Sequence, residues 1–166
     1  MNDLSDLNNI TESVINLCIK RNLNIGFAES CTGGLISSVL TSYPGVSAIF
    51  KGSVVCYAGE VKTSVLGVPD SCLKSFGEVS VPVARRMATG AREVLNCDWS
   101  LSVTGIAGPG GGSPEKPVGT VCFGISGPAF EWSVENIFRD KQRQKIQLDS
   151  AKFGLESLKQ AILGQL

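Results

Sequence analysis

Three side chains at two predicted strand-to-helix turns could together perform hydrolysis: Ser30, Tyr57 and Lys62. Ser30 lies between a short apolar run at 23–28 and a helical pattern at 35–41. The hydroxyl of a serine placed there lies near the free N–H groups of a helix start, which favour an alkoxide and an oxyanion. The simpler alternative is a serine that only caps the helix, and position alone favours that alternative.

Tyr57 and Lys62 bracket the second turn, between a predicted strand at 53–57 and a predicted helix at 60–66. A phenol and an amine at this spacing can reach one site across a turn. Burial or a nearby cation favours the neutral amine, which can then accept a proton. The alternative is a tyrosine at the edge of the core and a solvated lysine on a helix surface.

A glycine-rich stretch from Thr104 to Gly112 follows a predicted strand at 99–103 and contains five glycines in nine residues. Backbone of this freedom can wrap an anion with its N–H groups. The stretch lacks the Gly-Lys-Ser/Thr ending of a P-loop and the spacing of a dinucleotide fingerprint. A ligand-binding loop is favoured over a mobile surface loop, and Lys116 is expected to meet either a phosphate or solvent.

The chain contains no histidine. This excludes Ser-His and Cys-His nucleophile pairs and removes the commonest zinc ligand, so no metal site is expected. The base must then be a carboxylate, a lysine, a tyrosine or water. Glu29 adjoins Ser30, but on a strand its side chain points to the opposite face. We therefore expect Glu29 to order the turn, while its use as a base stays open.

The elements that must position these residues alternate between strand and helix over the first two thirds of the chain. This order predicts an α/β fold: a single three-layer α/β/α domain, spanning residues 1–166, around one mainly mixed sheet. The predicted strands are 23–28, 53–57, 99–103, 118–125 and 130–136, and the predicted helices are 7–18, 35–41, 60–66, 80–95 and 148–162.

Charge and hydropathy limit the partners. Lysine plus arginine and aspartate plus glutamate number 15 each, so no long-range attraction to nucleic acid or anionic lipid is expected. No apolar run approaches membrane-spanning length, and the polar start lacks the features of a signal peptide. The six scattered cysteines are expected to be reduced core residues. We expect a cytoplasmic protein that forms a homo-oligomer, a dimer or higher.

Four motifs in order resemble the CinA C-terminal domain family, whose enzymatic members are nicotinamide-nucleotide amidohydrolases of the PncC type. The motifs lie at 28–34, 52–62, 77–80 and 104–121. The resemblance implies hydrolysis of nicotinamide mononucleotide to nicotinic acid mononucleotide and ammonia, without a cofactor. It implies Ser30 as nucleophile, with Tyr57 and Lys62 matching the family tyrosine and lysine.

One position and one segment depart from the family pattern. Gly59 stands where the family usually has asparagine, and the segment 138–143 replaces a family Gly-Asp-Arg stretch. Arg143 is the best match for the anion-binding arginine, with Arg139 and Lys141 as substitutes. The predicted substrate-binding residues are Cys31, Thr32, Gly33, Thr104, Gly105, Gly108, Gly110, Gly111 and Arg143.

The predicted mechanism has neutral Lys62 take the Ser30 proton, directly or through Tyr57. N–H groups near 31–33 hold the oxyanion. The Lys62 amine or the Tyr57 hydroxyl is expected within about 3.5 Å of the Ser30 oxygen. Two other readings remain open: a non-catalytic nucleotide-binding or interaction module of the same fold, and a hydrolase of another small amide.

Overall fold

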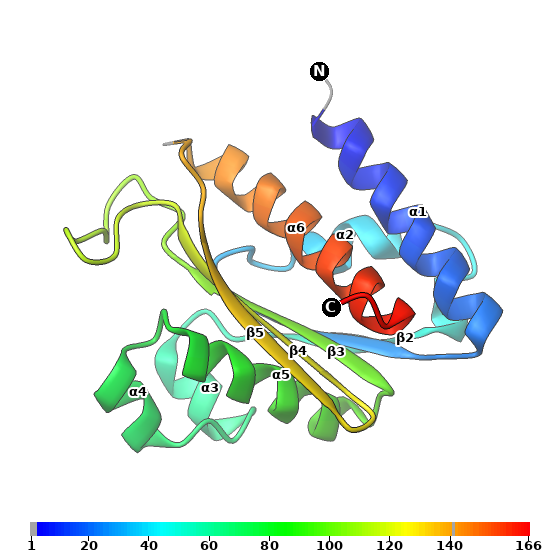
Figure 1. The fold of residues 1–166 in the computed structure, drawn as a ribbon, viewed down its shortest axis with the longest axis horizontal. Coiled ribbons are helices and arrows are strands. Elements are labelled where there is room, and N and C mark those ends of the chain that lie inside the picture. Colours follow the sequence, from blue (N-terminus) through cyan, green and yellow to red (C-terminus); the bar gives the residue numbers. More distant parts are fainter. Residues whose placement is uncertain (1–2, 141) are drawn as a thin grey trace.

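The computed structural model describes residues 3–140 and 142–166 and has one five-stranded sheet at its centre (Figure 1). The strand order is β2-β1-β3-β4-β5. β1 pairs in parallel with β2 and β3, whereas β3 with β4 and β4 with β5 pair antiparallel. The predicted α/β fold with a mixed sheet is confirmed. The strands are β1 (Ile25–Glu29), β2 (Phe50–Val55), β3 (Trp99–Gly105), β4 (Thr120–Gly127) and β5 (Phe130–Ile137).

Helices cover both faces of the sheet (Figure 1). One face carries α1 (Asp3–Arg21), α2 (Leu35–Thr41) and α6 (Arg143–Leu163), and the other carries α3 (Gly59–Ser64), α4 (Asp70–Phe76) and α5 (Val81–Leu95). A short 3₁₀ turn, Val46–Ala48, precedes β2. Because both faces are covered, β1 and β4 are buried along their whole length. None of the helices in the described residues is both long enough and apolar enough to span a membrane.

Small residues let α5 approach the sheet closely. The hydroxyls of Ser100 and Ser102 each donate to a carbonyl of α5, those of Ala88 and Ala84, at 2.6 Å. A Cβ atom at Gly124 of β4 would lie 2.4 Å from the same Ala84 carbonyl oxygen. The contact therefore requires glycine at this position, and it fixes α5 and the segment that leads into it.

The structure departs from the sequence-based prediction in the bounds of several elements and in one additional helix. The predicted strand 53–57 begins and ends earlier, since β2 spans Phe50–Val55, and Tyr57 therefore lies in the turn. α4 was not predicted, because its seven residues, none of them fully buried, are too few to show a clear helical period. α6 begins at Arg143. The predicted start at 148 was too late, because the polar first turn of the helix gives no hydrophobic pattern.

Gly124→Ala should lower the free energy of unfolding by about 1 to 3 kcal/mol, because the new methyl group meets backbone that cannot move away without shifting α5. Urea denaturation measures this change. The control is Val94→Ala on the exposed face of α5, where the side chain is 54% exposed and a change within about 0.5 kcal/mol is expected. Equal stability of the two variants would show that α5 does not need this close approach.

Candidate active site

The carboxyl ends of β1, β2 and β3 meet at one edge of the sheet, because these three strands are parallel. The Ser30 N–H donates to the Val103 carbonyl at 2.9 Å, and the Cys56 N–H donates to the Glu29 carbonyl at 2.9 Å. The pairing thus continues one residue beyond β1 and holds Ser30 between the ends of β2 and β3. Ligand sites of open α/β sheets lie at this kind of edge.

The Glu29 carboxylate, which is completely buried, holds the start of α2. It accepts hydrogen bonds from the N–H groups of Gly34, Ile36 and Ser37 at 3.1, 3.1 and 3.0 Å. The hydroxyls of Thr32 and Ser37 donate to it as well. These N–H groups have no partner within the helix, and a negative charge there is favourable. The expectation that Glu29 orders the turn is confirmed, and it is Glu29, not Ser30, that caps the helix.

The capping by Glu29 also limits which N–H groups can stabilise an oxyanion. The N–H of Gly33 donates to the Ser30 carbonyl at 3.1 Å. Within the described part of the chain, the N–H groups of Cys31 and Thr32 donate to no other residue. These two groups, next to Ser30, are therefore the donors available for an oxyanion in this turn.

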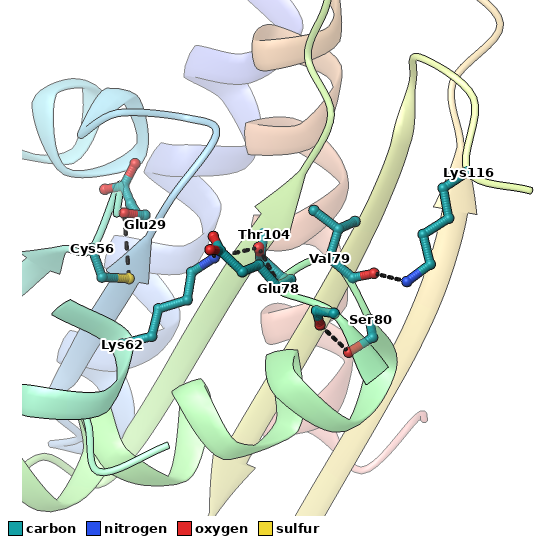
Figure 2. A network of polar contacts seen from close by, with 9 residues as sticks. Glu29, Cys56, Lys62, Glu78, Val79, Ser80, Thr104 and Lys116 are labelled. Carbon is teal, nitrogen blue, oxygen red and sulfur yellow. Dashed lines mark hydrogen bonds and ion pairs between the residues drawn. The ribbon is translucent and has the colours of Figure 1, made fainter. Parts of the chain in front are cut away.

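The Lys62 side chain is 1% exposed, which confirms the predicted burial of its amine. Figure 2 shows it extending from α3 toward Thr104 and Glu78. Its Nζ donates to Thr104 Oγ1 at 3.2 Å and to Glu78 Oε2 at 3.3 Å. The Glu78 carboxylate attracts the amine, and this explains why the hydrogen bond expected between Lys62 and Ser30 is not formed.

Tyr57 is 60% exposed at the mouth of the site, and its hydroxyl likewise makes no hydrogen bond with Ser30. Instead it accepts from Arg143 Nη2 at 2.8 Å, while Arg143 Nη1 donates to the Gly108 carbonyl at 2.7 Å. Arg143 thus connects Tyr57 to the glycine-rich loop from the first residue of α6. Arg139 lines a separate groove, and Lys141 lies outside the described residues.

A cavity of about 160 Å³ collects most of these groups. It brings together seven predicted site residues: Ser30, Cys31, Tyr57, Lys62, Thr104, Gly105 and Arg143. Five others do not line it: Thr32, Gly33, Gly108, Gly110 and Gly111. Glu78, Val79 and Ala107 line it without having been predicted, although the first two lie in the 77–80 motif. Gln147 of α6, whose amide donates to the Cys31 carbonyl at 2.8 Å, had no signal in the sequence.

The glycine-rich loop keeps free backbone donors. Among the described residues, the N–H groups of Ala107, Gly108 and 110–112 have no hydrogen-bond partner. Lys116 is bound within the protein, because its Nζ donates to the carbonyls of Phe76 and Val79 at 2.9 and 2.7 Å. Lys116 therefore fastens the loop to the segment that carries Glu78 (Figure 2).

Cys31 is the other side chain in the cavity that could act as a nucleophile. Burial raises the pKa of its thiol to about 12. The thiolate is the reactive form of cysteine, and it is nearly absent at neutral pH when the pKa is this high. Burial therefore leaves Cys31 without a ready thiolate, so the thiol has no such advantage over the Ser30 hydroxyl.

Comparisons with known proteins agree with one another. A family model described as the CinA C-terminal domain matches residues 7–162. A CinA-like protein of Prochlorococcus marinus is 45% identical over 160 residues, covering 95% of this chain and 37% of that protein. The chain thus spans little more than a third of that relative. The crystal structure of a competence/damage inducible protein, CihA from Agrobacterium tumefaciens, has a TM-score of 0.92 and 37% identity, covering 95% of this chain and 96% of that one.

Glu29→Gln should lower the free energy of unfolding by about 2 to 3 kcal/mol, because an amide nitrogen would face N–H groups that need an acceptor. Chemical denaturation measures the loss. Glu60→Gln is the matched control, since Glu60 is exposed on α3. If Glu29→Gln were as stable as the control, the carboxylate would not be what holds α2.

Cys31 should resist alkylation by iodoacetamide in the native protein at pH 8. With a thiol pKa of about 12, roughly one molecule in ten thousand carries the thiolate at that pH. The reactive form is lost below the raised pKa, so resistance should persist through the neutral range. Mass spectrometry of the labelled peptides compares Cys31 with Cys72, which is partly exposed and should react first. Modification of Cys31 at the rate of Cys72 would contradict this.

Proposed function

Because the chain belongs to the CinA C-terminal domain family, we propose that it is an amidohydrolase that converts nicotinamide mononucleotide to nicotinic acid mononucleotide and ammonia. The observation that carries the proposal is one cavity that holds the Ser30 hydroxyl, the buried Lys62 amine and the Tyr57 phenol. In a chain without histidine, the amine and the phenol of this cavity are groups that can move protons at the serine.

In the proposed reaction, the neutral amine of Lys62 takes the Ser30 proton, directly or through the Tyr57 hydroxyl. The Ser30 oxygen attacks the carboxamide carbon, and the N–H groups of Cys31 and Thr32 hold the oxyanion. Lys62 or Tyr57 returns a proton to the leaving ammonia. Water then hydrolyses the acyl-enzyme with the same groups, and no metal or cofactor takes part.

The substrate's phosphate has partners close to this cavity. The free N–H groups of Ala107, Gly108 and 110–112 can bind phosphate oxygens, as anion-binding loops do. Arg143, already bonded to the Gly108 carbonyl and to Tyr57, adds a positive charge between the loop and the reacting groups. The pyridinium ring withdraws electrons from its carboxamide, so a base of modest strength suffices.

A non-catalytic nucleotide-binding module is the second candidate. One observation favours it: Lys62 donates to Glu78 and Thr104 and not to Ser30. Such a module would bind nicotinamide mononucleotide with no ammonia released, and calorimetry beside the activity assay separates the two functions.

The test incubates the purified protein with nicotinamide mononucleotide in buffer containing EDTA and measures ammonia by a coupled enzymatic assay. Ser30→Ala and Lys62→Arg should each lower kcat by at least about a thousandfold, because the first removes the nucleophile and arginine cannot accept a proton. Ser30→Ala should change the unfolding free energy by less than about 1 kcal/mol, since the Ser30 side chain makes no hydrogen bond among the described residues.

Ser42→Ala, at the exposed end of α2, is the control for both variants and should keep the unmodified turnover. Near-normal turnover by Ser30→Ala would remove Ser30 as the nucleophile. Near-normal turnover by Lys62→Arg would remove Lys62 as the base. No ammonia from the unmodified protein, together with measurable binding, would favour the non-catalytic module.

A further inference from the structure

Glu78 is a charged partner of Lys62 to which the proposed mechanism gives no role. Its Oε2 lies 3.3 Å from the Lys62 amine, yet its side chain is 54% exposed. The backbone around it is fastened more firmly than the carboxylate. Thr104 Oγ1 donates to the Glu78 carbonyl at 3.0 Å, and Lys116 donates to the carbonyls of Phe76 and Val79 (Figure 2). The carboxylate can therefore turn while its main chain stays in place.

Glycine at position 59 makes the present place of this carboxylate possible. A Cβ atom at Gly59 would lie 2.3 Å from Glu78 Oε1 and 2.7 Å from its Cδ. Gly59 is the first residue of α3, and the Glu78 carboxylate fills the space that a side chain there would take. The departure from the family pattern at position 59 and the Glu78–Lys62 contact are thus two parts of one arrangement.

Glu78 also lines two neighbouring cavities. It belongs to the walls of the 160 Å³ cavity with Ser30 and of an outer cavity of about 510 Å³ with Gly59 and Thr63. Pockets that enclose a ligand of nucleotide size measure about 300 to 1,000 Å³, so the inner cavity is too small alone. Of the residues that the structure describes, Glu78 is the one that lines both cavities.

The charge of Lys62 depends on all the groups that face it. The ionisable side chains on the elements around it are Glu29, Cys31, Cys56, Tyr57, Glu78 and Arg143. Burial raises the pKa of the Cys31 and Cys56 thiols to about 12 and 11, so both are uncharged at neutral pH. The Glu29 carboxylate already accepts hydrogen bonds from the N–H groups at the start of α2. Among the described residues, Glu78 is the carboxylate that bonds to the amine, and an opposite charge at this distance favours a protonated amine.

The carboxylate of Glu78 faces its own set of charges. Glu60, Asp70 and Lys74 line the outer cavity with it, and Lys74 is paired with Asp70. Lys116 is held by carbonyl oxygens on the far side of the segment. The outer cavity therefore offers no unpaired cation that would hold the carboxylate there in place of Lys62.

We propose that Glu78 is a positioning residue that holds Lys62 charged and bonded to itself rather than to Ser30, and that its outward turn releases the amine to act as the base. The proposal rests on the proposed function, since it concerns the base of that reaction. Once released, the amine loses its proton to water and can then accept the proton of Ser30.

The first test reads the charge of Lys62 without any substrate. Proton-detected NMR of protein labelled with ¹³C and ¹⁵N in lysine follows the Lys62 side chain against pH, with Lys62→Arg identifying its signal. Glu78→Gln should lower the midpoint of that titration by about one pH unit, because it removes the opposite charge beside the amine. Gly59→Ala should lower it in the same direction, because the new methyl group displaces the carboxylate. Glu60→Gln should leave it unchanged.

The second test measures kcat and kcat/KM for nicotinamide mononucleotide against pH. Glu78→Gln should move the rising limb of the profile down by the same amount and leave kcat at high pH within twofold, where Lys62 is neutral in both proteins. A purely structural role would lower kcat at every pH. An unchanged midpoint of the Lys62 titration in both Glu78→Gln and Gly59→Ala overturns the proposal. If the Lys62 titration shifts in a protein that releases no ammonia, the effect of Glu78 on the charge of Lys62 is upheld and the proposed function is rejected.

Discussion

Burial of the Glu29 carboxylate against the first turn of α2 is the interaction on which the site depends. A buried carboxylate is costly unless donors and favourable dipoles surround it. Here three N–H groups of the helix start and the hydroxyls of Thr32 and Ser37 supply them. Because side chains alternate along an extended chain, the next residue, Ser30, faces away from α2 and into the cavity. The hydrogen bonds that the Glu29 carboxylate accepts thus also hold the turn that places Ser30 in the cavity.

The sheet then brings distant segments to that serine. β1 lies between β2 and β3, so the chain leaves β1 toward one neighbour and later returns on its other side. Loops diverge at such a reversal and leave a cavity at the carboxyl ends of the strands. Tyr57 after β2 and Thr104 at the end of β3 therefore reach the side of Ser30. From the opposite layer, Arg143 and Gln147 of α6 bond to both turns and close the site.

Without histidine, the proposed chemistry of the cavity depends on whether the Lys62 amine is charged or neutral. Burial favours the neutral form of Lys62, and the nearby Arg143 acts in the same direction. The Glu78 carboxylate acts in the other direction, and the amine bonds to it and not to Ser30. These effects are opposed, and in our proposal the movement of the Glu78 carboxylate decides whether Lys62 can accept a proton. Arg143 meanwhile keeps Tyr57 at the mouth of the cavity.

The sequence alone determined the residue types, the α/β alternation and the two turns that carry Ser30 and Lys62, because apolar periodicity and motif spacing are local properties. It also excluded histidine chemistry. It could not assign Glu78 a role, because the Glu78–Lys62 contact joins segments 16 residues apart through space that only Gly59 leaves open. Nor could it show that Lys116 is used to fasten a loop. Which donors remain free, and which charges face the amine, were decided by tertiary packing, since these depend on distances between elements that no local pattern encodes.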